Sequence, residues 1–296
     1  MINYKGSTFA EVYEEILRDV IYEPDHVTKP RGQKINELIN VSLEFDPMFP
    51  LYENKKRSSQ FEYIAGELVW YFNGMKDTNF ISKYSKFWNS IKNEDGTSNS
   101  AYGNLIFSER ENGYTQWNWA LESLLNDKDS RQAILHFNKP SHQYKGVKDF
   151  VCTLYGIFQI RNNRLNFTVH MRSNDLILGL PTDVAFFCLL QQQMYKHLLK
   201  RYPNLKLGMY THIVNSAHIY EKHFKLSKDM LNFRFNEMKF PNLRSDLVKI
   251  DGSPTDKMKR LKLDAILGEN DESLPYEDSL YDWINDWSTL HHREEV

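Results

Sequence analysis

The amino-acid sequence predicts a fold of the α+β or α/β class, in which strands and helices are interspersed along the chain. Residues 154–160 and 165–171 are alternating apolar runs joined by the polar turn residues 161–164, which is the pattern of a β-hairpin. Residues 60–73 carry apolar side chains at helical spacing, and residues 184–199 begin as an apolar run, so two buried helices are expected. The sequence contains no repeat, no low-complexity tract and no convincing linker, which favours one domain.

The segments before the hairpin alternate between helix and strand patterns. Thr8 and Glu11 have the spacing of a capping box, and a one-sided apolar pattern follows, so a short helix is expected there. Residues 39–45 alternate between apolar and polar side chains, as a strand does. Residues 117–125 again have helical spacing, and residues 133–137 are predicted to form the next strand.

The segments after the hairpin are less regular. Residues 207–210 and 212–215 are predicted as strands, and residues 217–224 as a further helix. From about residue 239 to residue 296 the chain is polar and shows little periodicity. This stretch is interpreted as a C-terminal extension of a single domain that covers residues 1–296.

The bulk composition is that of an ordinary soluble protein. Of 296 residues, 41% are hydrophobic and 26% are charged, and the formal net charge is -2. A general nucleic-acid coat would need a basic excess, so stable nucleic-acid binding is not expected. The sequence has no signal region and no apolar run of membrane-spanning length, so no membrane segment is expected and the cytoplasm is the predicted location.

The chain has two cysteines, Cys152 and Cys188. They lack CxxC and Cys/His ligand spacing, so no disulfide framework and no metal site are expected. Cys188 lies in a predicted buried helix and is interpreted as a small apolar core residue. Cys152 stands at the mouth of the hairpin, where Arg172 at the end of the partner strand could supply the positive charge that a thiolate nucleophile needs. Cys152 is therefore the candidate nucleophile.

Several other polar residues allow both a functional and a purely structural interpretation. Planar guanidinium groups bind a phosphate dianion well, although any single arginine could equally lie on a solvated surface. The candidates for a monophosphate site are Arg31, Arg131, Arg172 and Ser173. Glu67 stands inside an apolar helix pattern. It lies on the solvent face of that helix, or it is buried and held in place for a function. His218 and Tyr220 could bind a sugar hydroxyl from one side of an extended segment, or be a surface histidine and a core tyrosine.

Taken in their order, these segments resemble the thymidylate synthase superfamily and, in their details, its deoxycytidylate hydroxymethylase branch. The resemblance runs from roughly Arg31 to Tyr220 and rests on these segments: Arg31-Gly32, Phe49-Pro50-Leu51, residues 67–72, Asp77-Thr78-Asn79, Ala101-Tyr102-Gly103, Asp129-Ser130-Arg131, Cys152, Arg172-Ser173, Asp175, Gly179-Leu180-Pro181 and His218-Ile219-Tyr220. It implies a three-layer α+β fold with a mixed β-sheet flanked by helices. It also implies a homodimer in which the two sheets pack back to back.

The resemblance implies a mechanism. The thiolate of Cys152 would add to C6 of a pyrimidine nucleoside monophosphate, and C5 would then attack the one-carbon unit of 5,10-methylenetetrahydrofolate. Glu67 would organise water and proton transfers near the base.

The resemblance also implies binding roles for the polar residues. The phosphate would be held by Arg31, Arg172, Ser173 and, across the dimer interface, Arg131 of the partner subunit. The sugar 3′-hydroxyl would be bound by His218 and Tyr220. The folate cofactor would be bound by Asp175, Tyr102 and Trp88.

Asp183 stands where methyl-forming synthases carry asparagine, and it is a candidate for both catalysis and base recognition. Uracil presents an N3 donor and an O4 acceptor, which a carboxamide matches, whereas cytosine presents an N3 acceptor and N4 donors. A carboxyl group can accept from N4 and share a proton with N3, but an ionised one would meet O4 of uracil with a lone pair. Each such mismatch costs about 1–3 kcal/mol, and sites built on such pairing discriminate by roughly 10⁴-fold. A neutral acid could place its proton to suit either base, so at this point both bases stay open.

Further departures from the synthase pattern indicate the hydroxymethylase branch. Thr153 follows the cysteine where synthases usually have histidine, and Met171 begins a segment that synthases typically begin with glutamine. Residues 291–296 lack the apolar tail that closes synthase sites, and a less sealed site would let water attack the exocyclic methylene before hydride arrives. Gln132 replaces a second interface arginine of the synthases.

The expected activity is therefore hydroxymethylation of deoxycytidylate (dCMP) with 5,10-methylenetetrahydrofolate and water. The enzymatic alternatives are thymidylate synthesis from deoxyuridylate (dUMP), hydroxymethylation of dUMP and hydroxymethylation of CMP. An inactive relative that binds nucleotides or RNA is the non-enzymatic alternative. Phage DNA modification and the synthesis of nucleoside antibiotics are the expected settings.

Overall fold

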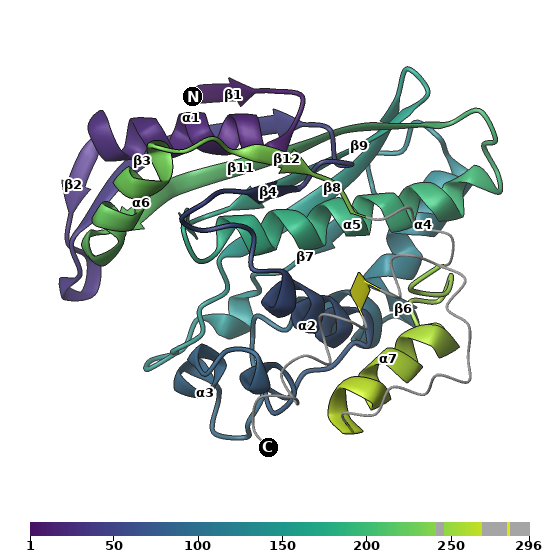
Figure 1. Ribbon diagram of the computed structural model, residues 1–296. Helices are drawn as coiled ribbons and strands as arrows, with labels where there is room; N and C mark the ends of the chain where they lie inside the picture. The colour runs from purple at the N-terminus through teal and green to yellow at the C-terminus, as the bar shows by residue number, and fades with distance from the viewer. Residues whose placement is uncertain (241–245, 268–282, 285–296) are drawn as a thin grey trace. The chain divides into compact units, whose positions relative to one another are not determined.

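The computed structural model describes residues 1–240, 246–267 and 283–284 (Figure 1). Backbone contacts divide the chain into two compact units. The first unit comprises Met1–Gln60, Cys152–Tyr195 and Asn204–Phe240, and the second unit comprises the other described residues. The single domain expected over the whole chain stays a prediction.

The first unit is built on a mixed β-sheet with the strand order β1-β3-β11-β9-β8 (Figure 1). Its strands are β1 (Ile2–Lys5), β3 (Ile35–Phe45), β8 (Thr153–Arg161), β9 (Arg164–Met171) and β11 (Lys206–Tyr220), with β2 (His26–Thr28) beside β3 and β10 (Asn174–Asp175) beside β11. The pairs β1–β3 and β9–β11 are parallel, whereas β3–β11 and β8–β9 are antiparallel. The long β11 is therefore hydrogen bonded on both sides.

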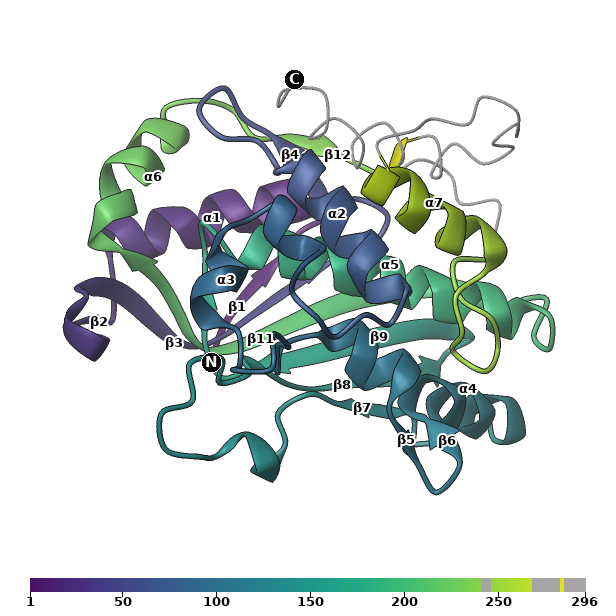
Figure 2. The same cartoon turned by 90° about the horizontal axis from the view of Figure 1, so that it is seen from below.

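Two helices cover one face of this sheet. α1 spans Phe9–Tyr22 and α5 spans Leu180–Leu199, and Figure 2 shows both on the same side of the strands. α1 begins with the predicted capping box, in which the Thr8 hydroxyl accepts from the Glu11 N–H and the Glu11 carboxylate accepts from the Thr8 N–H. The local sequence thus fixes where the first helix begins.

Aromatic rings hold the helices on the sheet. Phe45 and Phe167 are fully buried on the sheet face, where Phe45 contacts Phe9 of α1 and Phe167 contacts Phe187 of α5. Tyr210 of β11 contacts both sheet rings, so the five side chains form one continuous cluster. Burial of each ring contributes about 1.5–3 kcal/mol, which fixes the helices against the strands that carry the site.

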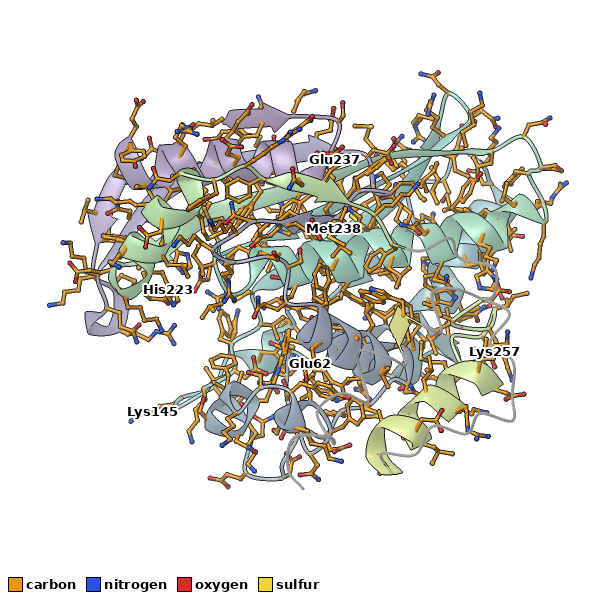
Figure 3. All side chains as sticks on the ribbon, in the orientation of Figure 1. Glu62, Lys145, His223, Glu237, Met238 and Lys257 are labelled. Carbon is orange, nitrogen blue, oxygen red and sulfur yellow. The ribbon has the colours of Figure 1, made fainter. Side chains whose placement is uncertain are left out.

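Smaller elements complete the first unit. β4 (Leu51–Glu53) pairs antiparallel with β12 (Asn236–Met238), whose Met238 is marked in Figure 3. α6 (Phe224–Leu231) follows β11 after the short 3-10 turn Glu221–His223.

The structure confirms the hairpin and corrects the segment after it. Asn162 and Asn163 both adopt left-handed backbone conformations, with φ of 48° and 59°, which gives the two-residue turn that suits the twist of a hairpin. β11 runs unbroken over Lys206–Tyr220, so the helix predicted over residues 217–224 is wrong for its first four residues. These four residues pair antiparallel with the start of β3, and this sheet pairing outweighs their local helical pattern.

The second unit is mainly helical. Its elements include α2 (Phe61–Phe72), α3 (Phe87–Ile91), α4 (Gln116–Asn126), α7 (Asp256–Leu267) and the short strands β5 (Arg110–Glu111), β6 (Tyr114–Thr115) and β7 (Ile134–His136). α2, α4 and β7 confirm the elements predicted at residues 60–73, 117–125 and 133–137. α7 lies in the polar C-terminal extension, for which the sequence pattern predicts no helix.

Gly103 allows its segment to lie directly on the end of α2. Tyr102 stacks on Tyr71 with ring centroids 5.4 Å apart, and a Cβ on residue 103 would overlap the backbone carbonyl of Tyr71. Since that backbone belongs to a packed helix, we expect Gly103→Ala to lower the free energy of unfolding by about 3 kcal/mol, measured by urea denaturation. In the control Gly6→Ala, the new Cβ would meet the Glu11 carboxylate, a side-chain end that can turn away at the cost of its capping hydrogen bonds, and a loss of about 1 kcal/mol is expected. Equal losses would contradict the close approach at Gly103.

Candidate active site

Cys152 and Arg172 meet at the open end of the β8–β9 hairpin. Thr153 pairs with Met171 across the two strands, so the residues just outside this pair lie opposite each other. Nη2 of Arg172 donates to Sγ of Cys152 at 3.5 Å, and the Arg172 N–H donates to the Cys152 carbonyl at 2.9 Å. A guanidinium group beside a sulfur atom stabilises the thiolate. The predicted contact is confirmed, and Cys152 keeps some accessible surface.

Cys188 has none of these features. It is fully buried in α5, and this burial raises the pKa of its thiol well above the usual value. A neutral, enclosed thiol is a poor nucleophile. The interpretation of Cys188 as a core residue is therefore confirmed.

Asp175 is held in a fixed orientation beside β11. β10 pairs Asp175 with His218, and one carboxylate oxygen of Asp175 accepts from the N–H groups of Ile177 and Leu178 at 2.8 and 3.1 Å. Two backbone donors on one oxygen fix the carboxylate as an acceptor. The turn after β10 thus presents an oriented acid.

His218 and Tyr220 lie together at the end of β11. Their rings meet edge to face, with centroids 5.1 Å apart, which agrees with their predicted projection to one side of the strand. Nδ1 of His218 is 3.3 Å from the carbonyl oxygen of Ser216. Because a carbonyl can only accept, Nδ1 carries the ring proton in this contact and Nε2 is left as an acceptor. Such an acceptor suits the hydroxyl group of a sugar.

Asp183 lies in the first turn of α5 and is bound by a residue that the sequence reasoning did not single out. Nδ2 of Asn174 donates to Oδ2 of Asp183 at 2.8 Å. Burial raises the pKa of Asp183 to about 7, against a smaller lowering by the Asn174 amide. A Cβ on residue 179 would lie 2.9 Å from the Asn174 amide nitrogen and 3.4 Å from Oδ2, so Gly179 leaves room for this contact.

The raised pKa of Asp183 has a consequence for stability. The usual value is 3.8, so between about pH 4 and pH 7 the folded chain binds the proton that the unfolded chain releases, and this contribution to stability is lost as pH rises. Asp183→Asn removes the titration. We therefore expect the free energy of unfolding of the variant, relative to the wild type, to increase between pH 5 and pH 8. Urea denaturation at the two pH values measures this difference, and a constant difference would contradict the assigned shift.

The other residues predicted to bind the phosphate are Ser173, Arg31 and Arg131, and they differ in their exposure. Ser173 follows Arg172 directly and is half-buried. Arg31 lies in the turn Pro30–Gly32 with a left-handed φ of 50° and is exposed, and Arg131 of the second unit is also exposed. Within the described ranges of the chain, neither of these two arginines has a hydrogen-bond or ion-pair partner. Two exposed cationic groups are thus available to an anion.

Glu67 is buried in the second unit and is bound by phenol groups. Its Oε1 accepts from the hydroxyl groups of Tyr63 at 2.8 Å and Tyr71 at 3.4 Å. Nε1 of Trp88 donates to the Tyr63 hydroxyl at 3.0 Å, and Tyr102 stacks on Tyr71. Glu67 is therefore buried and held by hydrogen bonds, and does not lie on the solvent face. It shares one aromatic cluster with Trp88 and Tyr102, which are predicted to bind the folate.

Neither a metal site nor a membrane segment is found in the part of the chain that the structure describes. No group of three or more His, Cys, Asp or Glu side chains is arranged to hold a metal ion there. None of the helices described is both long enough and apolar enough to cross a membrane.

Comparison with known proteins agrees with this geometry. The model of the thymidylate synthase family matches residues 11–266. The deoxycytidylate 5-hydroxymethyltransferase of Enterobacteria phage T6 is 32% identical over 69% of this chain and 83% of its own length. The deoxyuridylate hydroxymethyltransferase of Bacillus phage SP01 is 30% identical over 74% of this chain and 59% of its own length. The structure of the thermostable thymidylate synthase A from Bacillus subtilis matches 80% of this chain and 87% of its own, with a TM-score of 0.63 and 22% identity, and supports the fold alone.

The family match and the named relatives together make the chain a one-carbon transferase. With most of its length matched by the family model, the chain belongs to the thymidylate synthase family.

Proposed function

We propose that this chain is a deoxycytidylate 5-hydroxymethyltransferase. In the balanced reaction, dCMP, 5,10-methylenetetrahydrofolate and water give 5-hydroxymethyl-dCMP and tetrahydrofolate. The observation that carries this proposal is the segment from Arg172 to Asn174. Arg172 binds the sulfur of Cys152, and Asn174, two residues on, binds the carboxyl group of Asp183. A nucleophile and an acid that can recognise cytosine are thus held by one short stretch.

Cys152 is proposed to start the reaction. Its thiolate adds to C6 of the pyrimidine, and the electron pair of the C5–C6 double bond makes C5 a carbon nucleophile. Arg172 stabilises the thiolate before the addition. Glu67 is proposed to order water and to transfer protons, a role that suits a buried carboxylate bound by two phenols.

Asp183 is proposed to recognise the base. Its raised pKa, about 7, makes both of its protonation states available near neutral pH. In the complex it would accept from N4 of cytosine and share a proton with N3, whose basicity rises when C6 becomes saturated. O4 of uracil would instead meet a lone pair of the ionised carboxylate, so dUMP is expected to be a poor substrate of the form in which Asp183 is ionised.

The phosphate and the sugar are proposed to bind the cationic and hydrogen-bonding residues around this stretch. The phosphate would be held by Arg31, Arg172, Ser173 and Arg131 of the partner subunit. Nε2 of His218, left as an acceptor by the contact with Ser216, would accept from the 3′-hydroxyl group together with Tyr220.

Asp175 fits the folate. A pterin ring carries an amide N–H and an amino group, and the carboxylate of Asp175 is already oriented as an acceptor by Ile177 and Leu178. Trp88 and Tyr102 would act from the aromatic cluster around Glu67. When bound, 5,10-methylenetetrahydrofolate supplies a carbon at the oxidation level of formaldehyde.

Water is proposed to complete the reaction in place of hydride. The two phage relatives named above are hydroxymethyltransferases, one of deoxycytidylate and one of deoxyuridylate. The C-terminal residues 291–296, on which the expectation of a less sealed site rests, lie outside the described residues. Hydroxymethylation of dUMP is the second candidate, since the Bacillus phage relative is 30% identical.

The product of the reaction tests this proposal. The protein is incubated with dCMP or dUMP and 5,10-methylenetetrahydrofolate, and the nucleotides are analysed by mass spectrometry. We expect a hydroxymethyl product from dCMP and no absorbance change from dihydrofolate formation. A methylated product of dUMP with dihydrofolate would identify a thymidylate synthase instead, and unchanged nucleotides would favour an inactive relative.

A homodimer with Arg131 acting in trans predicts complementation between inactive variants. In a heterodimer of Cys152→Ala and Arg131→Ala subunits, one site has a native cysteine and receives a native arginine from the other subunit. Random reassociation makes half of the dimers mixed, so about a quarter of the wild-type activity should return. Each variant reassociated with itself is the control, and no recovery in the mixture would contradict the trans role.

A further inference from the structure

A chain of three hydrogen bonds runs from the core of the sheet to Asp183. The Tyr210 hydroxyl is 2.7 Å from Nδ1 of His212, and Nε2 of His212 is 3.2 Å from Oδ1 of Asn174. Nδ2 of Asn174 then donates to Oδ2 of Asp183 at 2.8 Å. Tyr210 and His212 are fully buried and Asn174 is 4% exposed, so water has little access to the chain.

The hydrogen bonds of this chain can run in two directions. In the forward direction each residue donates toward Asp183, and the Asn174 amide N–H faces its carboxylate. In the reverse direction the Asn174 carbonyl faces Asp183, which must then be protonated in order to donate. The direction of the hydrogen bonds therefore decides whether Oδ2 of Asp183 accepts from Asn174, which favours the ionised carboxylate, or donates to it, which requires the protonated acid.

The Tyr210 hydroxyl sets the direction. Burial lowers the pKa of His212 to about 3, so the ring is neutral and carries one N–H. Burial also raises the pKa of Tyr210, which keeps its proton. Among the described residues, Nδ1 of His212 is the one hydrogen-bond partner of the Tyr210 hydroxyl. Reversal would leave this O–H group buried and unpaired, which is costly, so the forward direction is favoured.

We propose that Tyr210, His212 and Asn174 are positioning residues that form a polarised hydrogen-bond chain and hold Asp183 as an acceptor, so that the site rejects uracil. The inference rests on the proposed function and deepens it. Uracil needs a donor opposite O4, and the forward chain opposes the protonated form of Asp183 that could supply one. Cytosine offers N4 donors and, when the shared proton lies on N3, a second donor, so an acceptor matches it. The chain thus removes the ambiguity of an acid that could otherwise suit either base.

The test compares base selectivity in variants that each alter one residue of the hydrogen-bond chain. Tyr210→Phe keeps the packed ring but removes the hydroxyl group that favours the forward direction of the hydrogen bonds. Asn174→Leu removes the donor to Asp183. For each variant, kcat/KM is measured with dCMP and with dUMP. We expect the ratio of the two values to fall about tenfold or more in both variants, because each makes a protonated Asp183 easier to form. Calorimetric binding of the two nucleotides gives the same ratio without turnover.

The control is Gln192→Met, which removes another buried hydrogen bond of α5, the 2.9 Å contact to the Pro47 carbonyl. It should lower both kcat/KM values in equal proportion, as a purely structural defect does. If the wild type prefers dCMP and both Tyr210→Phe and Asn174→Leu lower the two kcat/KM values in equal proportion, the role of the hydrogen-bond chain is overturned. The proposed function would still stand in that case. A wild-type preference for dUMP would overturn the proposed function, and the role of the chain with it.

Discussion

Cys152→Ala is expected to lower the turnover of dCMP by roughly 10⁴-fold or more, because the variant has no group that can add to C6. The substitution removes one sulfur atom from a half-buried position at the end of a hairpin, so the fold should persist. The nucleotide should still bind, since the proposed partners of its phosphate and base are other residues. The measurements are turnover under saturating dCMP and folate and the dissociation constant of dCMP by calorimetry.

Cys188→Ala is the matched control for this prediction. It also removes a thiol, but from a fully buried position in α5. A loss of about 1 kcal/mol of stability and nearly unchanged turnover are expected. Activity in Cys152→Ala above about 1% of the wild type would contradict a covalent role for the thiol.

The contact between Cys152 and Arg172 could be predicted from sequence because a hairpin is a local structure. Alternating apolar positions assign each strand, and the two left-handed residues Asn162 and Asn163 fix the turn. The register then follows by counting outward from the turn to Thr153 and Met171. Long-range information is not needed for this part of the site.

The end of β11 could not be predicted in the same way. Ala217 and Ile219 are fully buried there because the strand lies between neighbours that are distant in sequence. In isolation their spacing also suits the start of a helix. The choice is made by hydrogen bonds to the start of β3, and no local pattern encodes them.

The hydrogen-bond partners of Glu67 and Asp183 could not be predicted from the sequence either. Glu67 could be recognised as an acid in an apolar helix, but its burial depends on Tyr63 and Tyr71, one turn of helix away on either side. Asn174 stands between two residues of the family motif, yet its contact with Asp183 depends on the turn that leads into α5. Polar side chains at alternate buried positions of a predicted strand, such as His212, are the signal that could have indicated such a network.

Asp183→Asn is expected to shift the preference of the enzyme from dCMP to dUMP, changing the ratio of their kcat/KM values by at least about 10²-fold. The amide carbonyl can take over the hydrogen bond from Asn174, which leaves the amide nitrogen as the donor that faces the base. That donor matches O4 of uracil and opposes the N4 amino group of cytosine. The measurement is kcat/KM for each nucleotide with folate in excess.

Asp175→Asn is the matched control, because it makes the same chemical change in a carboxylate that is proposed to face the folate. It should raise the KM for folate and lower turnover of both nucleotides together, with the ratio unchanged. An unchanged ratio in Asp183→Asn would instead mean that residue 183 does not face the pyrimidine edge. The acid matters for selectivity because an ionised carboxylate cannot donate a hydrogen bond, whereas an amide can. The carboxylate therefore suits the N4 donors of cytosine, and the amide suits the O4 acceptor of uracil.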